Sequence, residues 1–190
     1  MTIMKSILSL LLSAGLLLSA ANSFAQMSDE KTVEVGGSPM YPSKDIIDNA
    51  VNSKDHTTLV AAVKAAGLVS TLKGAGPFTV FAPTNEAFGK LPEGTVDNLL
   101  KPENKQALVK VLTYHVVAGR IGARALRKMI KRGGGKAVLT TVEGGTLTAT
   151  DDGQTIMLTD DMGNKANITI SDVWQKNGVI HVIDAVMLPK

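Results

Sequence analysis

The sequence predicts an α+β domain in which a group of helices comes first and an antiparallel sheet follows. Through the first two thirds of the chain, apolar residues recur at helical spacing, as in the run from Leu59 to Ala66. From Lys136 onward, short runs rich in Val, Ile, Leu and Thr alternate with turn sequences such as EGG and DDGQ. Because helices and strands are segregated along the chain, α+β is favoured over a doubly wound parallel sheet.

The first 25 residues are typical of a secretory signal peptide. Lys5 precedes an apolar run over residues 7–18, and Ser23-Phe24-Ala25 offers small residues at the two positions that a signal peptidase reads. The alternative is a membrane anchor, but the run is shorter than the about 20 apolar residues that a span needs. We therefore expect cleavage after Ala25 and a secreted or periplasmic protein.

One domain is expected to follow the signal peptide. Residues 26–42 are polar and end in the sequence GGSPMYP, which predicts a flexible leader before a domain over residues 43–190. The chain contains no cysteine, which excludes disulfides, thiolate metal sites and a cysteine nucleophile. The domain must therefore rest on packing and hydrogen bonding.

The early helices are predicted from their caps. Ser43 is a candidate cap for a helix through residues 46–50, and Asp55 is a candidate cap for the next helix. Gly67 follows the last apolar position of that second helix and is the natural place for it to end.

The stretch FTVFAPTNEAF, from Phe78 to Phe88, changes from strand spacing to a helix start. Its first residues alternate as on a strand, Pro83 ends the strand, and Thr84 or Asn85 can cap a short helix. A polar cap and an acid beside an apolar strand are compatible with an active-site loop. They are equally compatible with a structural corner.

Two more helices precede the sheet. Pro102 fits the start of the first, which places an apolar set on one face, namely Leu108, Val111, Leu112 and His115. Ala123 to Arg132 are expected to form a short amphipathic helix, which the triplet Gly133-Gly134-Gly135 ends.

The residues that could carry catalysis or bind metal do not form a recognisable set. The three histidines include no pair at helical metal spacing, and His181 and Asp184 point to opposite faces of a strand. The sequence DDMGNKA lacks the terminal Glu of a calcium loop and predicts a turn. Neither an enzyme nor a cofactor is therefore expected, and no catalytic or metal-binding residue is assigned.

Tyr114 and His115 stand out because both bring a polar atom to an apolar helix face. One interpretation is a structural pair whose polar atoms are hydrogen-bonded by a neighbouring strand or loop. The other interpretation is a recognition site.

A cationic segment extends from Asn104 to Val142, where nine bases and no acid occur. Four of the bases lie at i, i+3, i+4 and i+7 of the amphipathic helix, namely Arg124, Arg127, Lys128 and Lys131, and Leu126, Met129 and Ile130 lie opposite. Such a stripe is either a solvated face or a binding surface for anionic polymers or head groups.

Three motifs in order, FTVFAPTNEAF, LTYHVVAGRI and NGVIHVIDAVMLP, resemble the fasciclin domain over residues 43–190. The resemblance implies a compact β-wedge or sandwich with helices packed alongside. It also implies that residues 78–88 are a structural corner, with Phe81 and Phe88 as core anchors. In animal matrix members a Tyr-His pair is implicated in integrin binding, and Tyr114 and His115 match it.

The resemblance also implies secretion or surface attachment and a role in adhesion. We therefore expect an exported, non-enzymatic interaction module whose partner is a protein or polysaccharide surface. The cationic helix makes an anionic membrane surface a further expected partner. Nucleic acid is not expected as a partner, because the protein is predicted to be exported and aromatic stacking residues are scarce. Some family members bind carotenoids, so a carrier of an apolar small molecule is the alternative. The sequence does not predict the oligomeric state.

Overall fold

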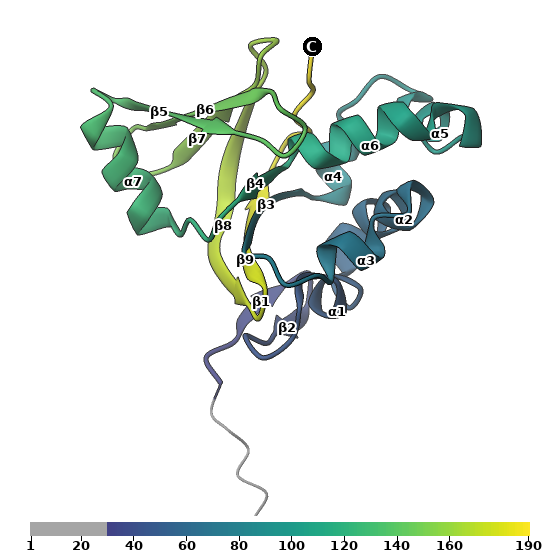
Figure 1. Cartoon of the computed structure of the whole chain (residues 1–190), viewed down its shortest axis with the longest axis horizontal. Helices are drawn as coiled ribbons and strands as arrows, with labels where there is room; N and C mark the ends of the chain where they lie inside the picture. The colour runs from purple at the N-terminus through teal and green to yellow at the C-terminus, as the bar shows by residue number, and fades with distance from the viewer. Residues whose placement is uncertain (1–29) are drawn as a thin grey trace, which may run out of the picture.

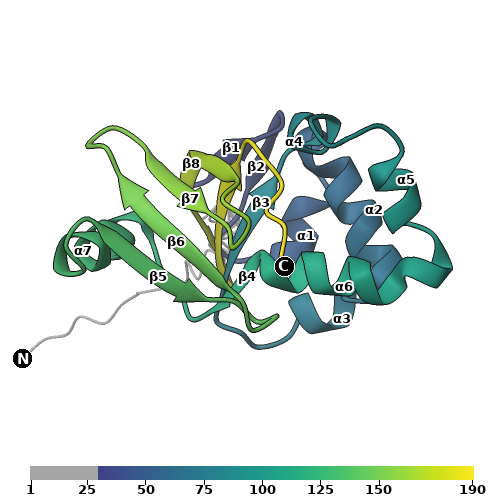
Figure 2. The same cartoon turned by 90° about the horizontal axis from the view of Figure 1, so that it is seen from above.

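A computed structural model describes residues 30–190 of the chain. The expected signal peptide and its cleavage site after Ala25 lie outside these residues. Helices α1 to α6 lie together on one side of a sheet, and helix α7 lies on the other side (Figures 1 and 2). The predicted α+β class is confirmed.

The described chain begins with a β-hairpin, formed by β1 (Val33–Val35) and β2 (Ser38–Met40). The flexible leader predicted over residues 26–42 is therefore wrong for residues 33–40. Val35 and Met40 are buried in the core, so two apolar side chains hold the hairpin against the domain. Each strand of the hairpin is only three residues long and is flanked by glycines and polar residues, so its apolar alternation is too short to predict a strand.

The first helical layer comprises α1 (Ile46–Ala50), the 3₁₀ turn η1 (Lys54–His56), α2 (Thr57–Ala66) and α3 (Val69–Leu72). Both predicted N-caps are wrong. Asp45, not Ser43, caps α1 by accepting from two backbone N–H groups, and Asp55 lies inside η1, so it cannot cap α2. Gly67 ends α2 in the left-handed conformation, as predicted.

The segment from Phe78 to Phe88 is a strand followed by a helix turn. Strand β3 (Phe78–Pro83) is buried on both faces, with Phe81 on one side and Val80 and Ala82 on the other. Thr84 then caps α4 (Asn85–Gly89) by accepting from the backbone N–H of Ala87 at 3.2 Å. Phe81 and Phe88 are both buried, which confirms them as core anchors.

A second group of helices follows, comprising α5 (Thr95–Leu99), the 3₁₀ turn η2 (Pro102–Asn104) and α6 (Lys105–Tyr114). Pro102 opens the 3₁₀ turn that leads into α6, which agrees with the predicted helix start. After strand β4 (Val116–Ala118), helix α7 (Ala123–Arg132) has the predicted bounds. Packing of α6 against α2 closes the helical side of the domain.

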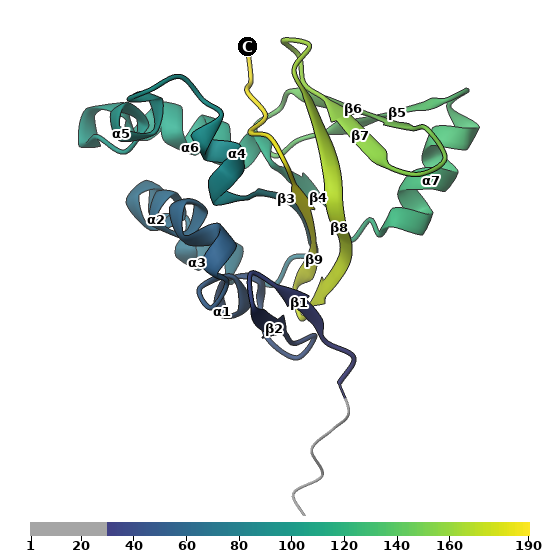
Figure 3. The same cartoon turned by 180° about the vertical axis from the view of Figure 1, so that it is seen from behind.

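The remaining strands are β5 (Lys136–Thr140), β6 (Thr146–Asp151), β7 (Ile156–Thr159), β8 (Lys165–Gln175) and β9 (Gly178–Ile183). The seven-stranded sheet has the order β4-β3-β9-β8-β7-β6-β5. Figure 3 shows the long strand β8 curving beside β9. The sheet is antiparallel except that β3 and β9 are parallel, which corrects the purely antiparallel prediction.

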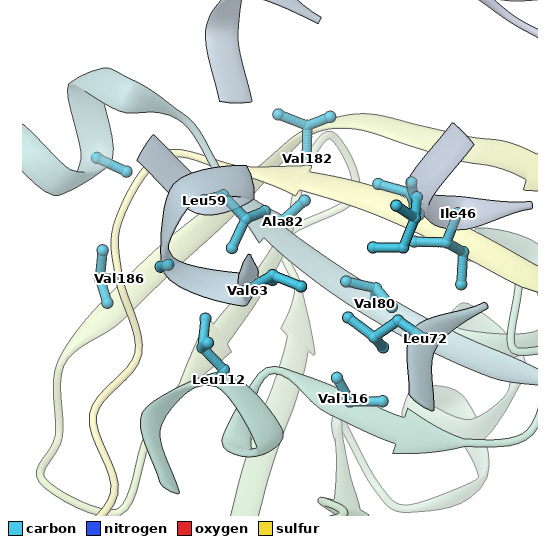
Figure 4. Close-up of a cluster of buried hydrophobic side chains, with 14 of the residues drawn as sticks. Ile46, Leu59, Val63, Leu72, Val80, Ala82, Leu112, Val116, Val182 and Val186 are labelled. Atoms are coloured by element: carbon cyan, nitrogen blue, oxygen red, sulfur yellow. The ribbon is translucent and has the colours of Figure 1, made fainter. Parts of the chain in front are cut away.

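The two ends of the sheet approach each other. Val117 of β4 forms a bridge with Thr141, and the backbone N–H of Val142 donates to the carbonyl of Val116 at 2.7 Å. The curved sheet therefore nearly closes around one core, which includes Phe81, Tyr114 and Leu126. A second core lies between the sheet and helices α1 to α6 and is shown in Figure 4.

Candidate functional site

Tyr114 is the last residue of α6, and its side chain is completely buried. Its phenol oxygen donates to the carbonyl of Thr146 at 2.5 Å and accepts from the backbone N–H of Asp161 at 3.0 Å. Burial raises the pKa of the phenol to about 12, because the charged form would lose its hydration. The side chain therefore ties α6 to the start of β6 and to the turn between β7 and β8.

His115 follows Tyr114 and is 3% exposed. Its Nδ1 lies 2.8 Å from the carbonyl of Val111, and its Nε2 lies 3.0 Å from the backbone nitrogen of Met187. A backbone N–H can only donate, so Nε2 accepts and Nδ1 carries the proton. Burial lowers the pKa of this imidazole to about 4, so the ring is neutral at pH 7.

Tyr114 and His115 thus form the hydrogen-bonded structural pair that one interpretation of the sequence predicted. Neither side chain presents appreciable surface in this conformation. A role of these two residues in recognition stays a prediction, and it would require them to become exposed.

Helix α7 carries the predicted cationic stripe on its solvent side. Arg124, Arg127, Lys128 and Lys131 are all exposed, whereas Leu126 and Ile130 are buried. Met129, expected to face the core, is 36% exposed and lies at the border of the apolar face.

One of the four cations has a partner that the local sequence did not reveal. Arg127 Nε lies 3.2 Å from Asp151 Oδ2, at the end of β6. Within residues 30–190, Arg124, Lys128 and Lys131 form no ion pair within 4 Å. The stripe therefore presents three unpaired charges and one that is partly neutralised.

The start of α7 is fixed by β8. Asp172, the residue at which β8 bulges, has a positive φ of 60° and accepts from the backbone N–H of Ala123 through Oδ1 at 2.7 Å. Trp174, 40% exposed, lies directly over Gly122, where a Cβ would come within 2.7 Å of the indole. Local sequence pattern does not reveal this contact, because Asp172 is 49 residues from its partner.

His181 and Asp184, the pair considered from the sequence as a catalytic dyad, do not hydrogen-bond to each other. His181 Nε2 donates to the carbonyl of Ile121 and its Nδ1 accepts from the backbone N–H of Asp172, while Asp184 accepts from Asn167. His181 and Asp184 therefore have separate partners, as the strand geometry predicted. Among residues 30–190, the His, Asp and Glu side chains form no group suited to a metal ion.

The helical core contains a cavity of about 80 Å³ that sequence reasoning missed. Its wall is almost entirely apolar and comes from α1, α2, α3, α6 and β3. His56 is part of this wall and is 2% exposed. The sequence places these residues in a core, but it does not show where packing leaves space.

No helix in the described region is long and apolar enough to cross a membrane.

These features define a class of small α+β domains, built on a nearly closed sheet with helices on one side and a Tyr-His corner between them. The fasciclin domain model matches residues 54–189, and the chain belongs to this family. The resemblance noted in the sequence is thereby confirmed.

Relatives support this membership. The protein sll1483 of Synechocystis sp. is 45% identical over 161 residues, which cover 84% of this chain and 82% of that protein. The immunogenic protein MPB70 of Mycobacterium bovis is 35% identical over 145 residues, which cover 74% of this chain and 66% of that protein. A FAS1 domain pair from the insect cell adhesion molecule fasciclin I has the same fold, with a TM-score of 0.70 and 18% identity over 78% of this chain and 52% of that chain.

Proposed function

We propose that this protein is an exported, non-enzymatic interaction module that attaches to anionic extracellular or envelope surfaces through helix α7. The observation that carries the proposal is the exposed stripe of Arg124, Arg127, Lys128 and Lys131. Helix α7 lies on the side of the sheet away from helices α1 to α6 (Figure 2), and all four side chains are exposed to solvent. Family membership and the adhesion role named for the insect protein support an interaction function.

The physical basis of the proposed attachment is electrostatic. An uncompensated row of cations raises the local concentration of anionic polymers or head groups. Exposed charges act over about 10 Å at 0.1 M salt, so binding should weaken steeply as the salt concentration rises. The apolar side chains of Leu126 and Ile130 anchor the helix independently of these charges.

The test is co-sedimentation with anionic vesicles and with acidic polysaccharide across a salt series. The test variant replaces Arg124, Arg127, Lys128 and Lys131 by Gln, which keeps helix propensity roughly unchanged. The matched control replaces four exposed lysines elsewhere, namely Lys54, Lys101, Lys105 and Lys165, by Gln and changes the net charge equally. We expect the α7 variant alone to lose binding at low salt. Equal binding by both variants would contradict the proposal.

A second candidate function is the carriage of an apolar small molecule, which the cavity in the helical core favours. At about 80 Å³ the cavity is far smaller than a carotenoid, so the helices would have to move apart to admit that ligand. Visible absorption by the protein purified from its own source, followed by organic extraction of the pigment, tests the carotenoid form of this candidate. A colourless protein that takes up no added carotenoid would contradict it.

A further inference from the structure

The cavity in the helical core has a wall suited to hydrocarbon. Six of its apolar residues are Leu59, Val63, Leu72, Val80, Leu112 and Ile180. Figure 4 shows Val63, Leu112 and Val80 approaching a common space from α2, α6 and β3. An empty space of this kind costs packing energy, which an apolar occupant would recover.

The cavity is not fully enclosed by the protein. Its lining includes Val60 and Thr113, which are half-buried, and Lys64 and Val142, which are exposed. Val142 is 51% exposed and places hydrocarbon at the rim. These four residues form the rim through which a slender molecule would have to enter.

One polar atom in the wall lacks a partner. His56 Nδ1 lies 2.9 Å from Ser53 Oγ, but the buried Nε2 makes no hydrogen bond with any described residue. Burial lowers the pKa of this imidazole, and the backbone carbonyl of Ala82 opposes that change by raising it, so this carbonyl is an acceptor with which a ligand must compete for the ring. A buried nitrogen without a partner is destabilising, and buried polar atoms are normally satisfied.

The chemistry of the wall limits what the ligand carries. The one charged lining side chain in the described structure, Lys64, is exposed at the rim, so an ion deeper inside would lose hydration without compensation. An uncharged hydroxyl can donate and accept, so it can pair with either tautomer of His56. The small volume favours an unbranched chain, since the apolar cavity known to bind benzene is about 150 Å³, roughly twice as large.

We propose that this cavity binds an unbranched, uncharged alkyl molecule that ends in an oxygen group, with the oxygen hydrogen-bonded to His56 Nε2 and the chain among Val63, Leu72 and Leu112. A short primary alcohol is the simplest member of this class. The inference rests on the second candidate function, in which the cavity carries a small molecule, and it adds the chemical class of that ligand. It is independent of attachment through α7.

The test compares 1-butanol with 1-chlorobutane, which has the same number of heavy atoms but no hydroxyl. Binding is followed in the NMR spectrum through the methyl groups of Val63, Leu72 and Leu112 and through the imidazole nitrogens of His56. We expect both molecules to shift the methyl signals, and only 1-butanol to shift Nε2 as a new hydrogen bond would. Val60→Phe should block the rim and abolish binding, whereas Val51→Phe, on an exposed residue outside the cavity, should not.

His56→Leu isolates the hydrogen bond. The affinity for 1-butanol relative to 1-chlorobutane should fall roughly fivefold in this variant, as expected for one net hydrogen bond. If the variant does not fold, the Nε2 shifts of the parent protein decide. Binding of both molecules with no response of His56 and no change in relative affinity would overturn the oxygen preference while leaving the carrier function standing. Failure of both to shift the cavity methyls would overturn both.

Discussion

His115 Nε2 accepts a hydrogen bond of 3.0 Å from the backbone N–H of Met187, a residue 72 positions later in the chain. The contact joins the end of α6 to the C-terminal segment. The next backbone N–H, that of Leu188, donates to Asp160 Oδ2 at 2.9 Å, so a second side chain holds the same segment. Two neighbouring backbone N–H groups of the C-terminal segment are therefore held by side chains, one by His115 and one by Asp160.

Replacement of His115 by Ala should lower the free energy of unfolding by about 1–3 kcal/mol. The change leaves the Met187 N–H without its acceptor and opens a cavity beside Val111. Denaturant melts measure the effect, with Gln106→Ala on the exposed face of α6 as the control. An unchanged midpoint accompanied by lost binding to a surface partner would assign His115 to recognition instead.

Tyr114→Phe should also destabilise the protein, by about 1–2 kcal/mol, although it keeps the aromatic ring. The removed hydroxyl serves both the Thr146 carbonyl and the Asp161 N–H, and both groups would lose their partner. Because the ring still fills its site, we expect the loss to appear without a change in the denaturant slope. Amide hydrogen exchange at Asp161 provides a local measurement, and protection equal to that of the parent protein would contradict the prediction.

Stability should fall as the pH is lowered from about 6.5 towards 4. Burial lowers the pKa of all three histidines, namely His56, His115 and His181. The unfolded chain therefore binds more protons than the folded chain in this range, and unfolding is favoured by acid. For His115, whose folded pKa is about 4 against 6.5 in the unfolded chain, the full loss is on the order of 3 kcal/mol.

Urea melts at several pH values measure this dependence. His115→Gln removes the titrating group while retaining polar atoms, so it should flatten the curve between pH 6.5 and 4. A stability that is constant over that interval in the parent protein would show that the histidines do not control it.

The sequence predicted the elements that depend on local pattern. The bounds of α7, the end of α2 at Gly67 and the turn from β3 into α4 all follow from spacing and cap residues within a few positions. The burial of His115 was predicted because helical spacing, continued one residue past the end of α6, places it on the face of Leu108 and Leu112. Such features need no knowledge of the rest of the chain.

What the sequence did not predict depends on residues far apart in the chain. The parallel pairing of β3 with β9 requires that residues 78–83 meet residues 178–183. The partner of Arg127 comes from β6, and the cap of α7 comes from β8. The cavity beside His56 is the volume left when several elements pack, and periodicity along one element carries no such information.

Gly122→Ala should displace the indole of Trp174. A Cβ at position 122 would lie 2.7 Å from the indole and 2.8 Å from Asp172 Oδ1, both too close for contact. Trp174 is the single tryptophan and is 40% exposed, so it can swing outward at a cost of about 1–3 kcal/mol. Its fluorescence emission should shift to longer wavelength. Gly89→Ala, where a Cβ would meet nothing within 4 Å and the backbone is not left-handed, is the control for an added methyl group, and a spectrum unchanged by Gly122→Ala would contradict the prediction.

Unequal contributions are expected from the four cations of α7. Arg127 already interacts with Asp151, so part of its charge is compensated, whereas Arg124 and Lys128 have no such acid within reach among the described residues. Arg127→Gln should therefore weaken binding to anionic vesicles less than Lys128→Gln does.

Asp151→Asn should act in the opposite direction and strengthen binding roughly twofold to fivefold, because it frees one cation near the surface. Vesicle titrations at low salt measure all three variants, and the differences should vanish at high salt as the charges are screened. Weaker vesicle binding by Asp151→Asn would contradict the prediction, as would a larger loss of binding in Arg127→Gln than in Lys128→Gln. Either result would mean that the ion pair holds Arg127 in a position that favours binding.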